Sequence, residues 1–265
     1  MSNYIKFLEA IKNDDLTSGL EYLENGGDPS LNDDEPFKVA CSYGNMEMIA
    51  ILLDDFRVNP ACNDNEPFQL ACANANLEAV KVLSRDRRIS VNTDDNLAFV
   101  LACGTGNIDL VKFLSSDKRV NPEGRNNEGL KKAIESSNMD IVKLLIEEVK
   151  INPTYDDNFP IRLAVKTNNL PIVKYLLKDK RVNPSDSDNE CIITATQKGY
   201  YKIVELLLNS SYIDPTFNNH TLLRIAVNNC EDDMKDDNPI LITFIVIRDW
   251  YQKNNMNAQD IYDSL

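Results

Sequence analysis

The feature that most constrains this chain is a repeat of about 31 residues, which runs through most of its 265 residues. One alanine recurs at this spacing without slippage. It stands at Ala40, Ala71, Ala102, Ala133, Ala164, Ala195 and Ala226. Self-similarity at a fixed period in this range is typical of stacked supersecondary units, each of which contacts only its neighbours. We therefore expect an elongated array, not the one or two compact domains that the length alone would favour.

Residues 157–184 show how one unit is expected to fold. Pro160 stands in an expected first helical turn, where its missing N–H costs nothing. A second amphipathic helix is predicted to begin at Pro171, after a polar break. The unit ends in the sequence V-N-P, which is extended because a residue before proline is kept out of the α region. The next turn carries Asp188-Asn189, a pair that tolerates positive φ, so each unit reads as turn, helix, turn, helix and extended exit.

These motifs resemble the ankyrin repeat family, whose units carry a T-P-L-H-x-A start, a glycine before the second helix and V-x-x-L-L near the end. The start appears here at residues 36–40, 67–71 and 221–226. The mid-unit position is occupied by Gly44, Ala75, Gly106, Ser137, Asn168 and Gly199. The period is shorter than the family's usual value of about 33 residues, and the histidine of the start motif is absent. The V-N-P ending with a short period resembles ankyrin arrays of amoebae and giant viruses.

The resemblance covers residues 1–230 and implies an all-α fold, an ankyrin-type helix-turn-helix solenoid of about eight stacked units with degenerate terminal caps. We expect a degenerate N-terminal capping repeat at 1–29 and six ankyrin-like repeats of about 31 residues at 30–217. A divergent last repeat follows at 218–265, with an acidic insertion and a closing apolar helix. Within the array, the exit at 85–92 reads as two residues too long, offset by a shortened next turn.

The apolar segment Ile240–Tyr251 near the end of the chain has two possible roles. It is too short to span a bilayer, which takes about 20 apolar residues. One interpretation is a helix that closes the last repeat. The other is a hydrophobic dimer or partner surface around Trp250, the only tryptophan. The sequence leaves both open, and we expect a monomer.

The chain is acidic, with a formal net charge of -14 and a pI of about 4.6. This charge disfavours a nucleic-acid partner or an anionic membrane surface. It favours a partner protein with a basic surface, although the aspartates also have a simpler explanation in solubility and turns. Residues 1–23 are charged and amphipathic, unlike a secretory signal. We therefore expect no membrane association and an intracellular, cytoplasmic location, with the nucleus as an alternative.

The six cysteines are expected to be free thiols. Cys41, Cys72 and Cys103 each follow a repeat alanine, so they form one column down the stack. Packed helices lie about 8–10 Å apart, whereas the Cα atoms of a disulfide are rarely more than about 7 Å apart. This arrangement predicts small buried thiols in a reducing compartment. The glycosylation patterns at 209–211 and 219–221 are then expected to be unused.

No motif in the sequence predicts catalysis, a cofactor or a metal. The only histidine, His220, lies in a predicted turn, and no phosphate-binding loop or C-x-x-C pair is present. Asp186, Asp188 and Glu190 alternate as calcium ligands do. However, other units repeat an aspartate at the position of Asp188, so turn chemistry explains it. We expect no enzymatic activity.

What remains is surface. Partners of ankyrin-like arrays contact the hairpin tips and the inner, concave side of the first helices, and this resemblance implies a protein-binding adaptor. Carried onto this sequence, the helix positions are Tyr43, Asn74, Thr105, Glu135, Lys166, Gln197 and Lys198. The tip positions are Asp33, Asp64, Asp95, Asp157 and Asp188. Tyr43 is the strongest candidate, because aromatic residues often anchor interfaces. The alternative is a structural or oligomeric role through the Ile240–Tyr251 segment.

Overall fold

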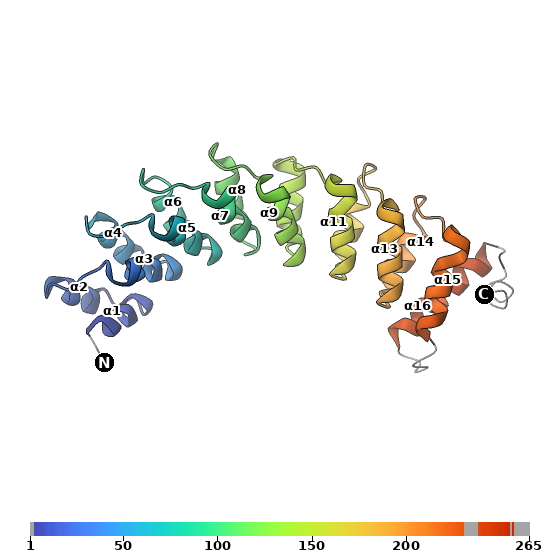
Figure 1. Cartoon of the computed structure of the whole chain (residues 1–265), viewed down its shortest axis with the longest axis horizontal. Coiled ribbons are helices and arrows are strands. Elements are labelled where there is room, and N and C mark those ends of the chain that lie inside the picture. Colours follow the sequence, from blue (N-terminus) through green and yellow to red (C-terminus); the bar gives the residue numbers. More distant parts are fainter. Residues whose placement is uncertain (1–2, 231–237, 255, 257–265) are drawn as a thin grey trace. The chain divides into compact units, whose positions relative to one another are not determined.

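The computed structural model describes residues 3–230, 238–254 and 256, and these residues form helices and turns with no strand. The chain divides into two compact units, Met1–Ile151 (unit 1) and Asn152–Leu265 (unit 2). Figure 1 shows the helices of both units. The all-α prediction is confirmed. Most of the predicted acidic insertion and most of the tail after Gln252 lie outside the described residues.

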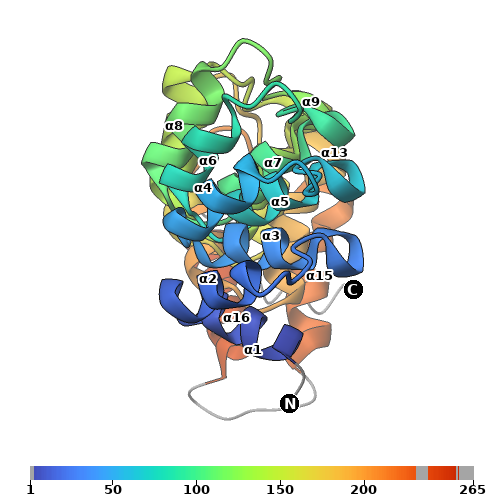
Figure 2. The ribbon, with the colours of Figure 1, turned by 90° about the vertical axis from the view of Figure 1, so that its left-hand side faces the viewer.

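Unit 1 contains paired helices in which a first and a second helix alternate along the chain. The first helices pack on one another in the order α1, α3, α5, α7 and α9, and Figure 2 shows α4, α6 and α8 on one side of them. A short π-helix, η1, continues α10. The bounds are α1 Asn3–Lys12, α2 Leu16–Glu24, α3 Leu31–Tyr43, α4 Met46–Asp54, α5 Cys62–Ala73, α6 Leu77–Leu83, α7 Thr93–Cys103, α8 Ile108–Ser116, α9 Gly124–Glu135, α10 Met139–Lys143 and η1 Leu144–Glu148.

Unit 2 repeats this pattern, and its last helix closes it. The first helices α11, α13 and α15 pack in sequence, and the second helix α14 packs between α12 and α16. The helix α16 also packs on α15 and buries Thr243, Ile247 and Tyr251, so it takes the place of a second helix in the last repeat. The bounds are α11 Tyr155–Lys166, α12 Leu170–Leu176, α13 Asp186–Gln197, α14 Tyr201–Leu208, α15 Phe217–Cys230 and α16 Pro239–Lys253.

The turn before six of the first helices holds three consecutive residues in the left-handed conformation. In α11 these are Asp156, Asp157 and Asn158, with φ of 50°, 52° and 59°. The right-handed helix begins only after them, so Pro160 lies in its first turn. The same triplet occurs at residues 32–34, 63–65, 94–96, 125–127 and 187–189. The sequence predicted positive φ at the Asp-Asn pair, and the structure extends it to three residues.

In four of the triplets, the third residue ties one repeat to the next. The Oδ1 atom of Asn96 accepts a hydrogen bond from the backbone N–H of Asn121 at 2.8 Å, and Asn158 accepts from Asn183 at 2.9 Å. Both partners stand 25 residues further along the chain. Asparagine suits this position because it tolerates the left-handed conformation and offers an acceptor. This explains why asparagine recurs at the start of the units.

The mid-unit position that resembles the family's glycine is left-handed in every described repeat, whatever residue occupies it. The φ angles are 73° at Gly44, 60° at Ala75, 84° at Gly106, 58° at Ser137 and 55° at Asn168. The backbone therefore keeps the conformation that glycine adopts most readily. The departures from glycine change the local strain and leave the architecture intact.

The prediction of an overlong exit at 85–92 is wrong. The backbone N–H of Ser90 donates to Asn65 Oδ1 at 2.8 Å, across the same 25 residues as in the other repeats. Ile89 and Val91 are buried at the positions that valine and proline occupy elsewhere. Valine can replace proline here because the segment is extended and buried. The search for a proline therefore placed the register two residues late.

Candidate functional site

The predicted positions of unit 1 lie at the carboxyl ends of its first helices. Tyr43 is the last residue of α3 and is 57% exposed, and Glu135 is the last residue of α9. Asn74 and Thr105 follow the ends of α5 and α7. The Nδ2 group of Asn74 donates to Ser42 Oγ at 3.2 Å, which links neighbouring repeats. We call the set Tyr43, Asn74, Thr105 and Glu135, with Lys166, Gln197 and Lys198 of unit 2, the helix-end column.

The helix-end column directly follows the buried residues of each first helix. In α3 the residues Ala40 and Cys41 have no solvent exposure. In α5, Ala71 and Cys72 also have no solvent exposure. One turn later the side chains face solvent. No hydrogen bond or ring contact engages the Tyr43 side chain within the described part of the chain. The fold therefore fixes the backbone at Tyr43 while leaving its side chain available.

The side chains of the unit 1 column differ in how far they are committed within the fold. Thr105 Oγ1 donates to the carbonyl oxygen of Ala102 at 2.8 Å, so its hydroxyl points back to its own helix. Glu135 lies 3.8 Å from the ammonium of Lys132, an exposed pair of the kind that contributes little to stability. Tyr43 is thus the large side chain of this column with the fewest contacts.

The unit 2 part of the helix-end column is charged and polar. Lys166, Gln197 and Lys198 are exposed at the carboxyl ends of α11 and α13. Lysines at helix carboxyl ends also complement the helix dipole, which gives both of them a structural explanation. The Oγ1 group of Thr167, beside Lys166, donates to the carbonyl oxygen of Leu163 at 3.0 Å. The two units therefore offer different chemistry near the carboxyl ends of their first helices.

The predicted tip residues occupy the middle of the left-handed triplets. Asp33, Asp64, Asp95, Asp157 and Asp188, the tip aspartates, are all exposed, with φ between 46° and 57°. They lie at the amino ends of the same first helices, so a length on the order of 12 Å separates them from the helix-end column at 1.5 Å per residue. Within each unit the structure thus places the predicted residues in two separate rows. The tolerance of aspartate for the left-handed conformation accounts for these residues without any partner.

The structure also reveals a motif that the sequence interpretation missed, a clamp of the form Asp-x-Arg in the loops after α4, α6, α8 and α12. Arg88 donates from its backbone N–H and from Nε to Asp86 Oδ1, and from Nη2 to Asp86 Oδ2 at 2.7 Å. The same Nη2 reaches the carbonyl oxygen of Leu53 in the preceding repeat at 2.8 Å. The clamps are Asp55–Arg57, Asp86–Arg88, Asp117–Arg119 and Asp179–Arg181. Their spacing of one repeat was the available signal.

The pKa values of the clamp aspartates and of Asp34 are shifted in opposite directions. Hydrogen bonds from Arg119 lower the pKa of the Asp117 carboxyl, and the other clamp aspartates are lowered in the same way. Asp34, which stands where other triplets have asparagine, is 7% exposed, and burial raises its pKa. These carboxyls hold backbone groups and arginines in place. None of them belongs to a metal-ligand cluster in the described residues.

The fourth exit lacks the clamp. Glu148-Val149-Lys150 replaces the motif, and the helix there becomes η1. Lys150 adopts a φ of 70°, a conformation that side chains other than those of asparagine and aspartate rarely take. The buried Oδ1 atom of Asn127 has no hydrogen-bond partner, in contrast to Asn96. Unit 1 therefore ends at an exit without the restraints of the three before it.

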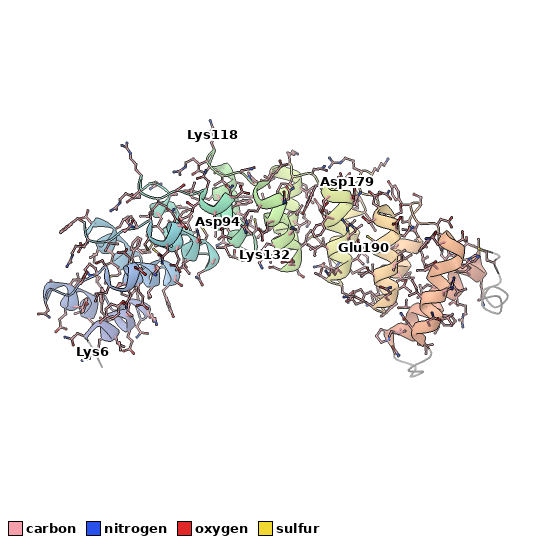
Figure 3. All side chains as sticks on the ribbon, in the orientation of Figure 1. Lys6, Asp94, Lys118, Lys132, Asp179 and Glu190 are labelled. Atoms are coloured by element: carbon pink, nitrogen blue, oxygen red, sulfur yellow. The ribbon has the colours of Figure 1, made fainter. Side chains whose placement is uncertain are left out.

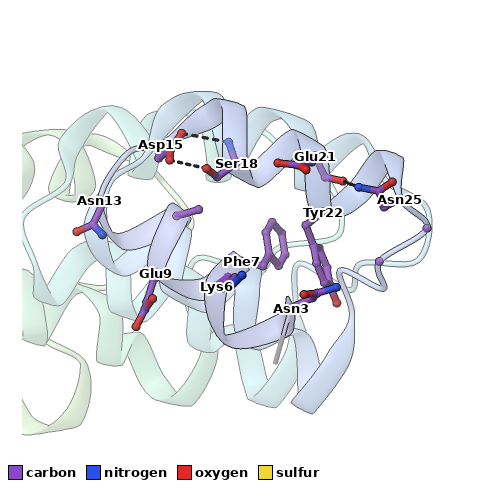
Figure 4. A pocket seen from close by; sticks show the side chains of 13 residues that line it. Asn3, Lys6, Phe7, Glu9, Asn13, Asp15, Ser18, Glu21, Tyr22 and Asn25 are labelled. Atoms are coloured by element: carbon purple, nitrogen blue, oxygen red, sulfur yellow. Dashed lines mark hydrogen bonds between the residues drawn. The ribbon is translucent and has the colours of Figure 1, made fainter. Parts of the chain in front are cut away.

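A hollow of ≈ 600 Å³ lies between α1 and α2, away from the predicted residues (Figure 4). Phe7 and Tyr22 stack within it, with ring centroids 4.3 Å apart. Its rim carries Lys6, Glu9 and Asn25. The rim mixes both charges with amides. Asp15 Oδ2 accepts a hydrogen bond from Ser18 Oγ at 2.6 Å in this hollow, but Asp15 is the N-cap of α2, so this pair is explained by helix capping and indicates no chemistry.

His220 serves the last repeat. Tyr251 OH donates to the carbonyl oxygen of Pro215 at 2.8 Å, so the His220 Nδ1 atom, 3.1 Å from that hydroxyl, is the donor to it. The ring therefore helps to hold α16 against α15. Within the described residues, no three His, Cys, Asp or Glu side chains are grouped to hold a metal ion. Among the described residues of the whole chain, no helix is both long enough and apolar enough to cross a membrane.

A family model described as ankyrin repeats (three copies) matches residues 7–95, 99–188, 130–219 and 161–235. These matches cover most of the chain and include all positions of the helix-end column and the tip aspartates. A comparison with curated proteins finds no match.

Proposed function

Because the chain belongs to the ankyrin repeat family, whose members are generally protein–protein interaction modules, we propose that it is a non-enzymatic adaptor that binds another protein. The binding surface is the helix-end column together with the tip aspartates. The observation that carries this proposal is Tyr43, a large aromatic side chain that is 57% exposed at the end of a tightly packed helix. Aromatic side chains on rigid backbone are frequent anchors of interfaces.

The variation of the helix-end column supports the same function. The buried positions beside it repeat almost unchanged, as alanine followed in three repeats by cysteine. The helix-end column varies from Tyr43 to Asn74 and Thr105 at the third position after the repeat alanine, and from Glu135 to Lys166 and Gln197 at the second. Packing fixes the first set, whereas most of the second set faces solvent. Such a division suits a scaffold that presents a specific set of side chains.

The charges indicate the chemistry of the partner. The tip aspartates form an exposed acidic row within each unit, and the net charge of -14 adds to their field. A partner with a basic surface is therefore favoured opposite the tips, and long polyanions such as nucleic acids are disfavoured. We propose that the adaptor acts as a monomer in the cytoplasm, away from membranes.

The test compares partner capture by the wild-type chain with capture by the variant Tyr43→Ala, Lys166→Glu and Lys198→Glu. A control variant, Lys81→Glu and Lys112→Glu, makes the same charge change at a half-buried and an exposed lysine on the second helices. We expect a partner that binds the wild type and the control with equal affinity and binds the column variant at least tenfold more weakly, a loss of about 1.4 kcal/mol.

Equal capture by all three proteins would remove the helix-end column from the proposal. Light scattering of the wild-type chain at high concentration then tests an oligomeric role of α16. A monomer would also remove that alternative.

A further inference from the structure

The loops that carry the first three clamps of unit 1 present a second exposed surface. In each loop the aspartate and the arginine of the Asp-x-Arg motif pair with each other. The residue between them points away from the fold. Phe56 is 94% exposed, and Arg87 and Lys118, at the same position in the next two repeats, are also exposed. Figure 3 shows Lys118 extending from the edge of the ribbon. We call Phe56, Arg85, Arg87 and Lys118 the clamp edge.

Phe56 has no role in folding that the structure shows. Its loop is fixed by the Asp55–Arg57 pair, by a hydrogen bond from Val58 N–H to the Asp55 carbonyl oxygen, and by one from Asn59 N–H to Asp34 Oδ1. The other clamps place a cation at this position, so the loop does not require an aromatic ring. A ring with this exposure leaves water only by contact with another molecule. Because the loop is already ordered, such contact costs little conformational entropy.

The clamp edge is positively charged, unlike the chain as a whole. Residues 54–57, 85–88 and 116–119 contain six cations and four carboxylates, against a net charge of -14 for the chain. Three of the carboxylates are engaged by the arginines of the clamps. Asp86 and, more weakly, Asp54 raise the pKa of Arg88. In the described part of the chain, no carboxylate forms an ion pair with the remaining cations of the edge.

We propose that the clamp edge docks an acidic protein segment, with an apolar side chain against Phe56 and carboxylates facing Arg87 and Lys118. Successive loops are one repeat apart, and packed helices are spaced by about 8–10 Å. An extended segment advances about 3.3 Å per residue, so carboxylates about three residues apart match the two cations. A short segment carries few charges and is only weakly repelled by the acidic chain, whereas a nucleic acid or an anionic bilayer is repelled strongly.

The experiment selects peptides of random sequence displayed on phage against the immobilised wild-type chain. Peptides that also bind the variant Phe56→Ala, Arg87→Glu and Lys118→Glu are removed. We expect the remaining peptides to be rich in Glu and Asp with one large apolar residue. A synthetic peptide of the selected sequence, labelled with a fluorophore, should bind the edge variant at least tenfold more weakly than the wild type.

Two control variants separate this surface from the others. Lys81→Glu with Lys112→Glu changes the same charge on the second helices, and Tyr43→Ala alters the helix-end column. Both should bind the peptide within about twofold of the wild type, so the clamp edge and the proposed adaptor surface succeed or fail independently. Unchanged circular dichroism and unfolding of the edge variant show that it is folded. If it is destabilised, Phe56→Ser and Arg87→Gln are tested singly.

Three results would overturn the proposal. They are selection of basic or uncharged peptides, equal binding of the selected peptide by wild type and edge variant, and a requirement for Tyr43. The wild-type chain is also tested with single-stranded DNA and with phosphatidylcholine vesicles containing about a quarter phosphatidylserine. Binding of either that is lost in the edge variant, without acidic peptides, would assign the surface to that class instead.

Discussion

At the scale of single residues, the asparagine that opens each unit has two roles. It adopts the left-handed conformation, and its Oδ1 atom accepts a backbone N–H of the following repeat, as Asn96 does from Asn121. The sequence predicted the first role, because Asp-Asn pairs are typical of turns with positive φ. It could not predict the second, because a hydrogen bond between residues 25 apart leaves no trace in residue type.

Asp34 is the exception that tests this role. It accepts the N–H of Asn59 at 3.0 Å as the asparagines do, but it is buried and its pKa is raised. A carboxyl with a raised folded-state pKa favours folding when protonated, and this contribution is lost as the pH rises through that pKa. At neutral pH the charge therefore costs stability. We expect Asp34→Asn to stabilise unit 1 by on the order of 1 kcal/mol at pH 7 in urea unfolding.

The pH dependence distinguishes this effect from a general loss of negative charge. The advantage of Asp34→Asn over the wild type should shrink as the pH falls below the raised pKa of Asp34 toward the unfolded value of about 3.9, because the wild-type carboxyl is then neutral. Asp33→Asn, which removes the same charge from an exposed neighbouring position, is the control. A gain equal to that of Asp33→Asn at every pH would contradict the explanation.

At the scale of secondary-structure elements, most of the architecture could be predicted. The alanine column fixes the unit length, and the apolar stripes fix the paired helices, because each helix must bury one face on its neighbours. The clamp was missed because its residues are charged and exposed, and a search for apolar periodicity passes over them. The exit at Val91 was misplaced because the packing there accepts valine where proline was sought.

The clamp is expected to contribute to the stacking of repeats. Arg119→Ala removes the pairing with Asp117 and the hydrogen bond to the carbonyl oxygen of Ser84 at 2.9 Å. The ion pair is partly exposed and contributes little, so most of the loss comes from the bond between repeats. We expect a destabilisation of about 1 kcal/mol in urea unfolding at pH 7.

The loss should diminish with acid, because the pKa of Asp117 is lowered in the folded state and its contribution disappears as the pH falls through that value. Lys118→Ala, one residue earlier and without an ion pair in the described residues, is the matched control and should leave stability unchanged. Equal effects of the two substitutions would show that the clamp has no role in stacking.

At the scale of the whole molecule, the sequence predicts a scaffold better than it predicts a site. The positions left free by packing could be identified, and the structure shows Tyr43 and the tip aspartates exposed. Which of them touches a partner depends on a second molecule, and the free chain encodes only exposure and charge. Phe56 was overlooked because it lies in a loop, and the repeat pattern was read from the helices.

Stability in such an array should be local, because each repeat contacts only its neighbours. Leu52 of α4 and Leu207 of α14 are fully buried in unit 1 and unit 2. Truncation to alanine should cost about 2–5 kcal/mol in either place through lost contacts and the cavity left behind. Hydrogen exchange should then rise in α2, α4 and α6 for Leu52→Ala and in α12, α14 and α16 for Leu207→Ala, with little change in the other unit. If either substitution raised exchange equally in all these helices, the chain would unfold as one cooperative block, and nearest-neighbour stacking would not describe it.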